Sequence, residues 1–148
     1  MQSKRKFLFV CTGNICRSPT AEAVMRHQSE IAGLSHLVAD SAGIQGYHAG
    51  EAPDMRTQAA ANRRGYAMDD LRARKVLPED FHRFDYLLAM DNSHLRWLQN
   101  HRPADAACQI QLFATHEVPD PYYGGQEGFE QVLDMVEAAV RDWIAKAG

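Results

Sequence analysis

The sequence predicts an α/β fold with an open, mostly parallel four-stranded sheet and helices on both of its faces. Short apolar segments alternate along the chain with segments whose residues recur at helical spacing. The first apolar segment contains almost no polar residue, which is typical of a strand covered on both sides in a parallel sheet.

The first strand and the first helix are predicted on either side of a tight loop. Residues 6–11, KFLFVC, form the strand. Ser18 is the expected N-cap of the helix and Pro19 its first helical residue. A helical repeat follows at Ala21, Val24, Met25, Gln28 and Ile31.

The next elements continue the alternation. Residues 36–43, HLVADSAG, predict a strand that runs into a glycine turn, and residues 53–65 predict a helix closed by its final glycine. Residues 84–90, FDYLLAM, are the clearest later strand, and a capped helix follows at once over residues 91–100. A shorter strand is expected near residues 109–113.

The last helix has the strongest pattern. Its apolar stripe consists of Phe129, Val132, Leu133, Val136, Val140, Trp143 and Ile144. Because no repeat, low-complexity segment or linker interrupts the chain, residues 1–148 are expected to form a single domain.

Composition and charge exclude several kinds of partner. Sixteen basic and 19 acidic residues give a net charge of −3, which lacks the positive excess needed to bind nucleic acid. No apolar run fits a signal peptide or spans a bilayer. The three cysteines form no secreted disulfide pattern, and the seven histidines have no metal-ligand spacing. We therefore expect a soluble cytoplasmic protein without a metal, nucleic-acid or membrane partner.

The segment CTGNICRSP joins the first strand to the first helix. A loop in that position directs backbone N–H groups and a helix dipole at one point, where phosphate binds well. Gly13 allows close backbone approach, and Asn14 tolerates a left-handed conformation. The planar guanidinium of Arg17 can grip two phosphoryl oxygens. The same positive field favours the thiolate of Cys11, a nucleophile to which Ser18 can donate a hydrogen bond.

Each of these residues alone also has a plainer interpretation. A single cysteine at a strand end is usually a small buried apolar residue, and an arginine at a helix start is usually solvated. Asp120, which lies between two prolines, would alone be interpreted as a turn former. The combination of strand, Cys-x5-Arg-Ser loop and helix favours phosphoryl transfer to sulfur.

The motifs CTGNICRSP and DPYY, with DSAG, APD, ARK and FDYLLAMD between them in order, resemble the low-molecular-weight protein tyrosine phosphatases across the chain. The resemblance implies that Cys11 attacks phosphorus and forms a cysteinyl-phosphate. Arg17 and the loop N–H groups would hold the phosphoryl group, while Asp120 would protonate the leaving phenolate and then activate water. The other loop residues are Thr12, Gly13, Asn14, Ile15, Cys16 and Ser18. The resemblance implies neither a metal nor a cofactor.

An aromatic slot and a supporting network are also implied. Tyr47, Tyr122 and Tyr123 would hold the phenyl ring of a substrate, although adjacent tyrosines in a loop are also common as surface cover. Ser41 would join Asn14 in a hydrogen-bond network that holds the loop open.

Three further residues bear on how this loop works. Several relatives have a histidine in place of Leu71 that joins the network, so loop support and thiolate stabilisation are expected to differ here. Ile15 resembles the phosphotyrosine branch, whereas relatives that act on phosphoarginine tend to have threonine there. Cys16 is expected to form a reversible disulfide with the nucleophile, with a buried packing cysteine as the alternative. Cys108 is assigned no role.

The expected substrate is therefore a phosphotyrosine-containing protein or a small aryl phosphate, hydrolysed by a monomer or weak dimer. An arsenate reductase on the same fold would need further cysteines after the mid-chain helix, and residues 72–84 contain none. A protein arginine phosphatase on the same fold is a second alternative. A non-catalytic anion-binding module would need neither Cys11 nor Asp120.

Overall fold

The computed structural model describes residues 3–122 and 124–147, in which strands and helices alternate. In chain order the elements are β1 (Arg5–Cys11), α1 (Arg17–Ile31), β2 (Leu37–Gly43), α2 (Met55–Arg63), α3 (Asp80–Arg83), β3 (Tyr86–Ala89), α4 (Asn92–His101), β4 (Gln109–Leu112) and α5 (Gln126–Ala147). The sequence pattern predicts all of these except α3, because a single turn of helix is too short to show an apolar repeat.

Within the described part of the chain, four strands form one sheet in the order β2-β1-β3-β4, and all of their pairings are parallel. The predicted open sheet is therefore confirmed, and it is parallel throughout rather than mostly so. β1 and β3 are its two inner strands, and their short, apolar sequences match burial on both faces.

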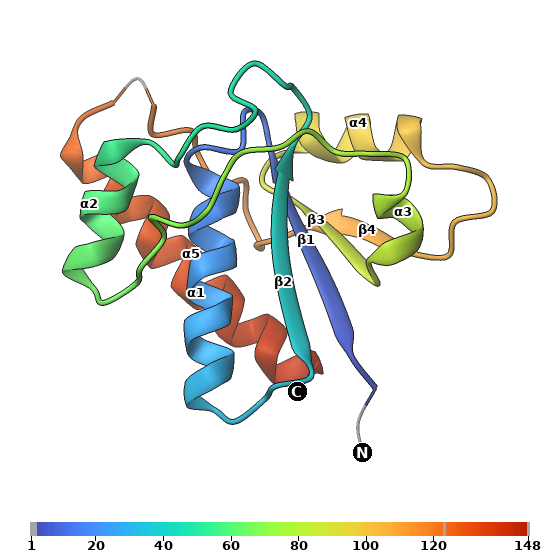
Figure 1. The fold of residues 1–148 in the computed structure, drawn as a ribbon, viewed down its shortest axis with the longest axis horizontal. Helices are drawn as coiled ribbons and strands as arrows, with labels where there is room; N and C mark the ends of the chain where they lie inside the picture. The colour runs from blue at the N-terminus through green and yellow to red at the C-terminus, as the bar shows by residue number, and fades with distance from the viewer. Residues whose placement is uncertain (1–2, 123, 148) are drawn as a thin grey trace.

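The sheet separates two apolar layers (Figure 1). Phe7 and Phe9 of β1 pack in the layer formed with α1, α2 and α5, whereas Leu8 and Val10 pack in the layer formed with α3 and α4. This alternation is the two-residue period of a strand, and all four side chains are fully buried because both layers are apolar. The predicted helices on both faces are confirmed.

Helix α1 begins at Arg17, and Cys16 rather than the predicted Ser18 occupies its N-cap position. The prediction of Ser18 as the cap was wrong because its hydroxyl contacts Cys11 and Asn14 instead of the first helical N–H groups. Pro19 is consequently the third helical residue, where its missing N–H still costs no helical hydrogen bond. Since no described side chain caps α1, its first N–H groups remain available to an anion.

The strand order places two loops beside each other. β2 lies on one side of β1, and β3 lies on the other side. The connections that follow β1 and β3 therefore diverge, and a crevice forms at the carboxyl ends of these two strands. The loop from β1 to α1 and the start of α4 both lie at this edge (Figure 1). Ligands of open parallel sheets bind at such an edge.

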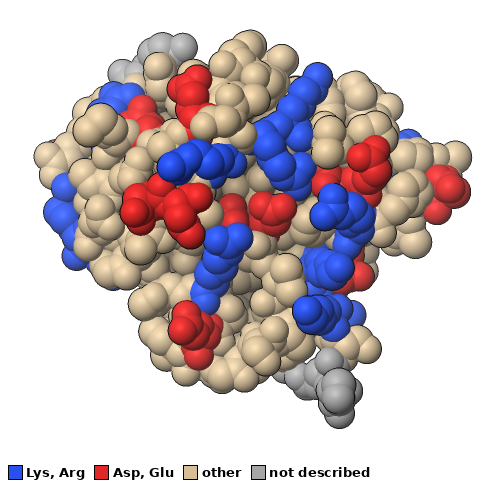
Figure 2. All heavy atoms as spheres, in the orientation of Figure 1, with Lys and Arg blue, Asp and Glu red and all other residues tan. Residues whose placement is uncertain are grey.

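The surface carries both signs of charge. On the face shown in Figure 2, most Lys and Arg side chains lie beside Asp or Glu side chains. Arg74, for example, contacts both Asp40 and Asp80. Among the helices of the described residues, none is both long enough and apolar enough to cross a membrane.

Candidate active site

The loop between β1 and α1 is tightly folded, and two residues remove the steric obstacles to this conformation. Asn14 has a φ of 61°, the left-handed conformation that asparagine tolerates. Gly43, at the end of β2, lies against the loop backbone: a Cβ there would be 2.6 Å from the carbonyl oxygen of Thr12 and 3.0 Å from the carbonyl carbon of Gly13. The glycine of the DSAG motif thus admits the loop against the strand end.

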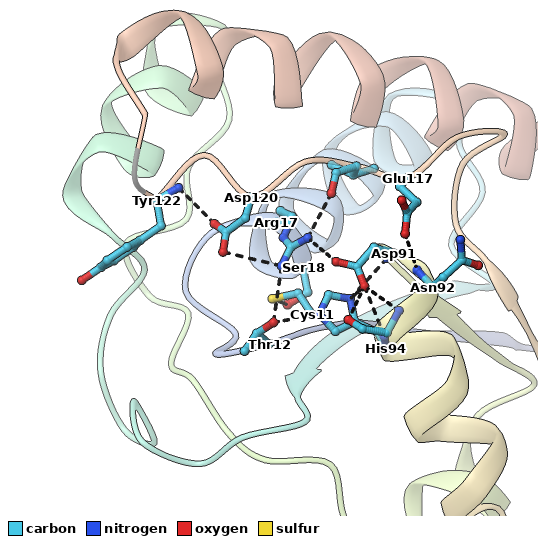
Figure 3. A network of polar contacts seen from close by, with 12 residues as sticks. Cys11, Thr12, Arg17, Ser18, Asp91, Asn92, His94, Glu117, Asp120 and Tyr122 are labelled. Atoms are coloured by element: carbon cyan, nitrogen blue, oxygen red, sulfur yellow. Dashed lines mark hydrogen bonds and ion pairs between the residues drawn. The ribbon is translucent and has the colours of Figure 1, made fainter.

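Cys11 lies at the start of this loop with 3% of its surface exposed. Its Sγ is 2.9 Å from Ser18 Oγ (Figure 3). Asn14 donates from Nδ2 to the same Oγ at 2.8 Å, which occupies a lone pair of the oxygen and lets the hydroxyl hydrogen point at the sulfur. The predicted nucleophile and its predicted donor are therefore in contact.

Arg17 is buried, with 4% of its surface exposed, and its guanidinium is fixed by groups outside the loop. Nη1 donates to Asp91 Oδ2 at 2.9 Å and to the carbonyl of Val118 at 3.0 Å (Figure 3). Nη2 lies 3.4 Å from Thr12 Oγ1 and 3.8 Å from Asp120 Oδ2. One amino group thus anchors the side chain, and the other meets the residues of the cleft.

Asp91, the N-cap of α4, is the counter-charge of this arginine. Burial opposes its charged form, but hydrogen bonding from Ser93 and the charge of Arg17 outweigh it and lower the pKa of Asp91 to about 2. The carboxylate is therefore ionised across the physiological range and neutralises a buried cation.

A cleft with a volume of about 220 Å³ collects the predicted reactive groups. The predicted catalytic and slot residues that line it are Cys11, Arg17, Asp120, Tyr47 and Tyr122. The Asp120 side chain is 44% exposed, and its Oδ1 accepts a hydrogen bond from the backbone N–H of Tyr122 at 3.0 Å. The third predicted slot residue, Tyr123, lies outside the described residues.

Some of the other predicted loop and network residues line the cleft, and the rest are buried beneath the loop. Thr12, Gly13, Ile15 and Cys16 also line the cleft. Asn14, Ser18 and Ser41 are buried. His48 joins the cleft wall as well, where its ring packs against Gly13 and its Nδ1 lies 3.2 Å from both carboxylate oxygens of Glu51.

A chain of buried hydrogen bonds supports the loop. Asn14 Nδ2 also donates to Ser41 Oγ at 2.9 Å, and Ser41 Oγ donates to Glu22 Oε1 at 2.6 Å. On the other end of the same amide, Asn14 Oδ1 accepts from the backbone N–H of Arg74 at 3.0 Å. Leu71 packs in the apolar layer of α1 and α5. The predicted partners Asn14 and Ser41 thus meet, and their chain ends on a carboxyl group.

Glu22 is 3% exposed on α1. Burial raises its pKa to about 7, although the hydrogen bond from Ser41 and the charge of Arg26 oppose this increase. The carboxyl group therefore changes its charge within the physiological pH range.

Cys16 is 4% exposed, and burial raises the pKa of its thiol to about 12. It is consequently a neutral thiol at physiological pH. Cys11 and Cys16 are both free in this structure, and a disulfide between them stays a prediction.

Comparison with known proteins decides the family. The family model described as low molecular weight phosphotyrosine protein phosphatase matches residues 6–147. The chain belongs to this family. A low molecular weight protein-tyrosine-phosphatase of Streptomyces coelicolor is 49% identical to this chain. The match covers 93% of this chain and 90% of the relative. The resemblance predicted from the motifs is therefore confirmed.

Solved structures agree with this assignment. The crystal structure of a protein tyrosine phosphatase from Entamoeba histolytica, with Hepes in its active site, matches this family member with a TM-score of 0.92 at 42% identity, covering 97% of this chain and 96% of that one. The crystal structure of a Drosophila arginine phosphatase matches with a TM-score of 0.91 at 31% identity, covering 95% and 96%.

Sequence reasoning missed three residues of the site, namely the buried Glu22 and His94 and the half-buried Asp91. Asp91 did give a signal, because it follows β3 closely and the predicted sheet places that end beside the loop after β1. Glu22 and His94 gave none, because helical spacing assigns a residue to a face but not to a partner.

We predict that Gly43→Ala displaces the loop between β1 and α1. The new Cβ would meet only backbone atoms, so the loop must move, with an expected loss of about 1–3 kcal/mol in stability. Affinity for inorganic phosphate, measured by calorimetry, should fall strongly. Gly46→Ala is the matched control, because its Cβ would meet only the flexible side chain of Lys75 at 3.7 Å. Equal phosphate affinity in both variants would contradict the prediction.

We predict that Glu22→Gln gains stability as the pH rises. Because the pKa of Glu22 is raised from 4.5 to about 7, its favourable contribution is complete below pH 4.5 and is lost as the pH passes 7. The variant never carries the buried charge. Its free energy of unfolding relative to that of the wild type should therefore increase between pH 5 and pH 8, by at most about 3 kcal/mol.

Urea denaturation at both pH values measures this difference. Glu30→Gln, at an exposed position of the same helix, is the control and should show no such gain. A relative stability of Glu22→Gln that falls as the pH rises would show that the ion pair with Arg26 outweighs the cost of burial.

Proposed function

We propose that this chain hydrolyses phosphotyrosine in proteins, and small aryl phosphates, through a cysteinyl-phosphate intermediate. The observation that carries the proposal is that Cys11, Arg17 and Asp120 line one cleft together with Tyr47 and Tyr122. Membership of the low molecular weight phosphotyrosine protein phosphatase family supports the same activity.

In the proposed first step, Cys11 Sγ attacks phosphorus and forms an S–P bond while the P–O bond to the tyrosyl oxygen breaks. Arg17 and the loop N–H groups stabilise the charge on the equatorial phosphoryl oxygens. Asp120 gives its proton to the departing oxygen.

In the second step, water attacks the phosphorus and gives its proton to the Asp120 carboxylate. The S–P bond breaks and inorganic phosphate forms. Ser18, whose hydroxyl lies 2.9 Å from Cys11 Sγ, stabilises the departing thiolate by donating a hydrogen bond. Because Arg17 and the loop supply the positive potential, we propose neither a metal nor a cofactor.

The two described tyrosines of the cleft suit an aromatic leaving group. Tyr47 is 70% exposed and Tyr122 37%, so both rings have apolar surface that a phenyl ring can cover. Burial and stacking of such a ring favour aryl over alkyl phosphates.

We propose one phosphatase domain over residues 1–148, which acts as a monomer or weak dimer in the cytoplasm without nucleic-acid or membrane partners. The family match over residues 6–147 supports the single domain. The mixed charges on the face shown in Figure 2 offer little to a polyanion, and three free cysteines fit a reducing compartment.

A second candidate activity is the hydrolysis of phosphoarginine. The similarity to the Drosophila arginine phosphatase favours it. Ile15, which lines the cleft, supports the phosphotyrosine assignment instead.

Phosphate release from matched peptides that carry phosphotyrosine, phosphoserine or phosphoarginine decides between these activities. EDTA and a thiol reductant are present throughout. Selective release from the phosphotyrosine peptide is the expected result. A preference for phosphoarginine would reassign the substrate while keeping the nucleophile, and the absence of release from any peptide would refute the proposed function.

Cys11→Ser should abolish phosphate release, with a loss of about 10⁴-fold or more, because the hydroxyl is a far weaker nucleophile than the thiolate. The loop would keep its N–H groups and Arg17, so inorganic phosphate should still bind. Turnover by this variant near the wild-type rate would remove Cys11 from its proposed role.

Asp120→Asn should lower kcat by about 10²- to 10⁴-fold, because the amide cannot protonate the leaving oxygen. The loss should grow as the pKa of the leaving phenol rises, which a series of substituted aryl phosphates measures. Asp105→Asn, at an 83% exposed carboxylate, is the control. A loss independent of the leaving group would argue against proton donation by Asp120.

A further inference from the structure

His94 is a fully buried histidine in the first turn of α4. Its Nε2 lies 2.8 Å from Thr12 Oγ1, and its Nδ1 lies 3.2 Å from the backbone nitrogen of Asp91 (Figure 3). A buried imidazole with a polar partner at each nitrogen has one fixed orientation. The proposed phosphatase mechanism gives it no part.

These contacts determine which ring nitrogen carries the proton. The backbone N–H of Asp91 can only donate, so Nδ1 of His94 accepts from it. Asp91 Oδ1, which is 3.3 Å from Nδ1, already accepts hydrogen bonds from Ser93 through both the backbone N–H and Oγ. A neutral ring that accepts at Nδ1 carries its hydrogen on Nε2 and donates it to Thr12.

The charged groups around His94 keep the ring neutral. Burial and the nearby charge of Arg17 lower the pKa of His94 to about 4. Asp91 at the start of its own helix, together with Asp120 and Glu117 from the segment before α5, acts in the opposite direction but does not outweigh them. The direction of the hydrogen bond to Thr12 is therefore constant above about pH 5.

Two donors consequently reach Thr12 Oγ1, namely His94 Nε2 at 2.8 Å and Arg17 Nη2 at 3.4 Å. A hydroxyl group has two acceptor lone pairs and one hydrogen. With both lone pairs occupied, the hydrogen of Thr12 points away from His94 and Arg17, and Thr12 lines the cleft that contains Cys11.

We propose that His94 is a positioning residue that makes the Thr12 hydroxyl a hydrogen-bond donor to the phosphoryl group in this cleft. The inference rests on the proposed function for the identity of the bound group. It adds a side-chain donor to the backbone N–H groups of the loop.

Nitrogen NMR of the imidazole rings in the whole labelled protein tests the position of the proton. Between pH 5 and pH 8 the His94 ring should be neutral with its hydrogen on Nε2. A hydrogen on Nδ1 would overturn the inference, because Nε2 would then accept the Thr12 hydrogen and keep it from the phosphoryl group.

Binding of inorganic phosphate, measured by calorimetry, tests the coupling between the two residues. Thr12→Val removes the hydroxyl at nearly constant shape and should weaken phosphate binding by about tenfold or more. His94→Phe should cause a similar loss. Because His94 acts through Thr12, the double variant should bind no more weakly than either single variant. Additive losses would overturn the inference.

Two control variants separate this role from simple packing. Thr12→Ser should recover most of the affinity lost in Thr12→Val, because it restores the hydroxyl group. His101→Phe, at an exposed position at the other end of α4, should bind phosphate like the wild type. If His94→Phe does not fold, Thr12→Val and the NMR measurement still decide, since undiminished phosphate affinity in Thr12→Val overturns the inference.

These measurements are independent of turnover. If the wild type binds phosphate and shows the coupling but releases no phosphate from any peptide, the proposed function fails and the inference stands. If it hydrolyses phosphotyrosine while Thr12→Val keeps the wild-type phosphate affinity, the inference fails and the proposed function stands.

Discussion

A guanidinium group with 4% of its residue's surface exposed needs a fixed counter-charge, and Asp91 supplies it to Arg17 at 2.9 Å. The pair joins the loop after β1 to the start of α4 after β3, so it depends on these two strands being neighbours. Removing this carboxylate would leave the buried cation with only the more distant and more exposed Asp120 at 3.8 Å, which costs more than a surface ion pair contributes. The parallel order of the sheet and the chemistry of the cleft are therefore linked through one contact.

Besides the contact between Arg17 and Asp91, hydrogen bonds hold the loop from the side of α1 and from the side of α4. Behind the nucleophile, hydrogen bonds connect Ser18, Asn14 and Ser41 to the carboxyl group of Glu22 on α1. On the side of α4, His94 contacts Thr12 directly. The elements around the loop, α1, β2 and α4, thus all contribute polar side chains that hold it in place. A loop fixed in this way meets an incoming anion without reorganising, which is the main way that proteins stabilise developing charge.

The predicted strands and the long helices follow from apolar spacing alone, and CTGNICRSP identified the loop because its residue types have a joint chemical meaning. Ser18 shows where local rules stop. As a serine before a proline it has the pattern of a helix cap, but its contact with Cys11 depends on how the whole loop closes. Glu22 and His94 depend on tertiary contacts with Ser41 and Thr12, which lie far from them in the sequence, so a single sequence does not reveal them.

Val118 links the cation of the site to the segment that carries the carboxylic acid. Its carbonyl accepts from Arg17 Nη1, and its N–H donates to the carbonyl of Met90 at 2.8 Å. Asp120 lies only two residues further along, so the guanidinium proposed to bind the phosphoryl group also anchors the backbone beside the proposed proton donor. A slower reaction after substitution of Arg17 would therefore combine weaker anion binding with a displaced acid. In the proposed mechanism the two residues would therefore act as one kinetic unit, and the rate losses of their separate substitutions would not add.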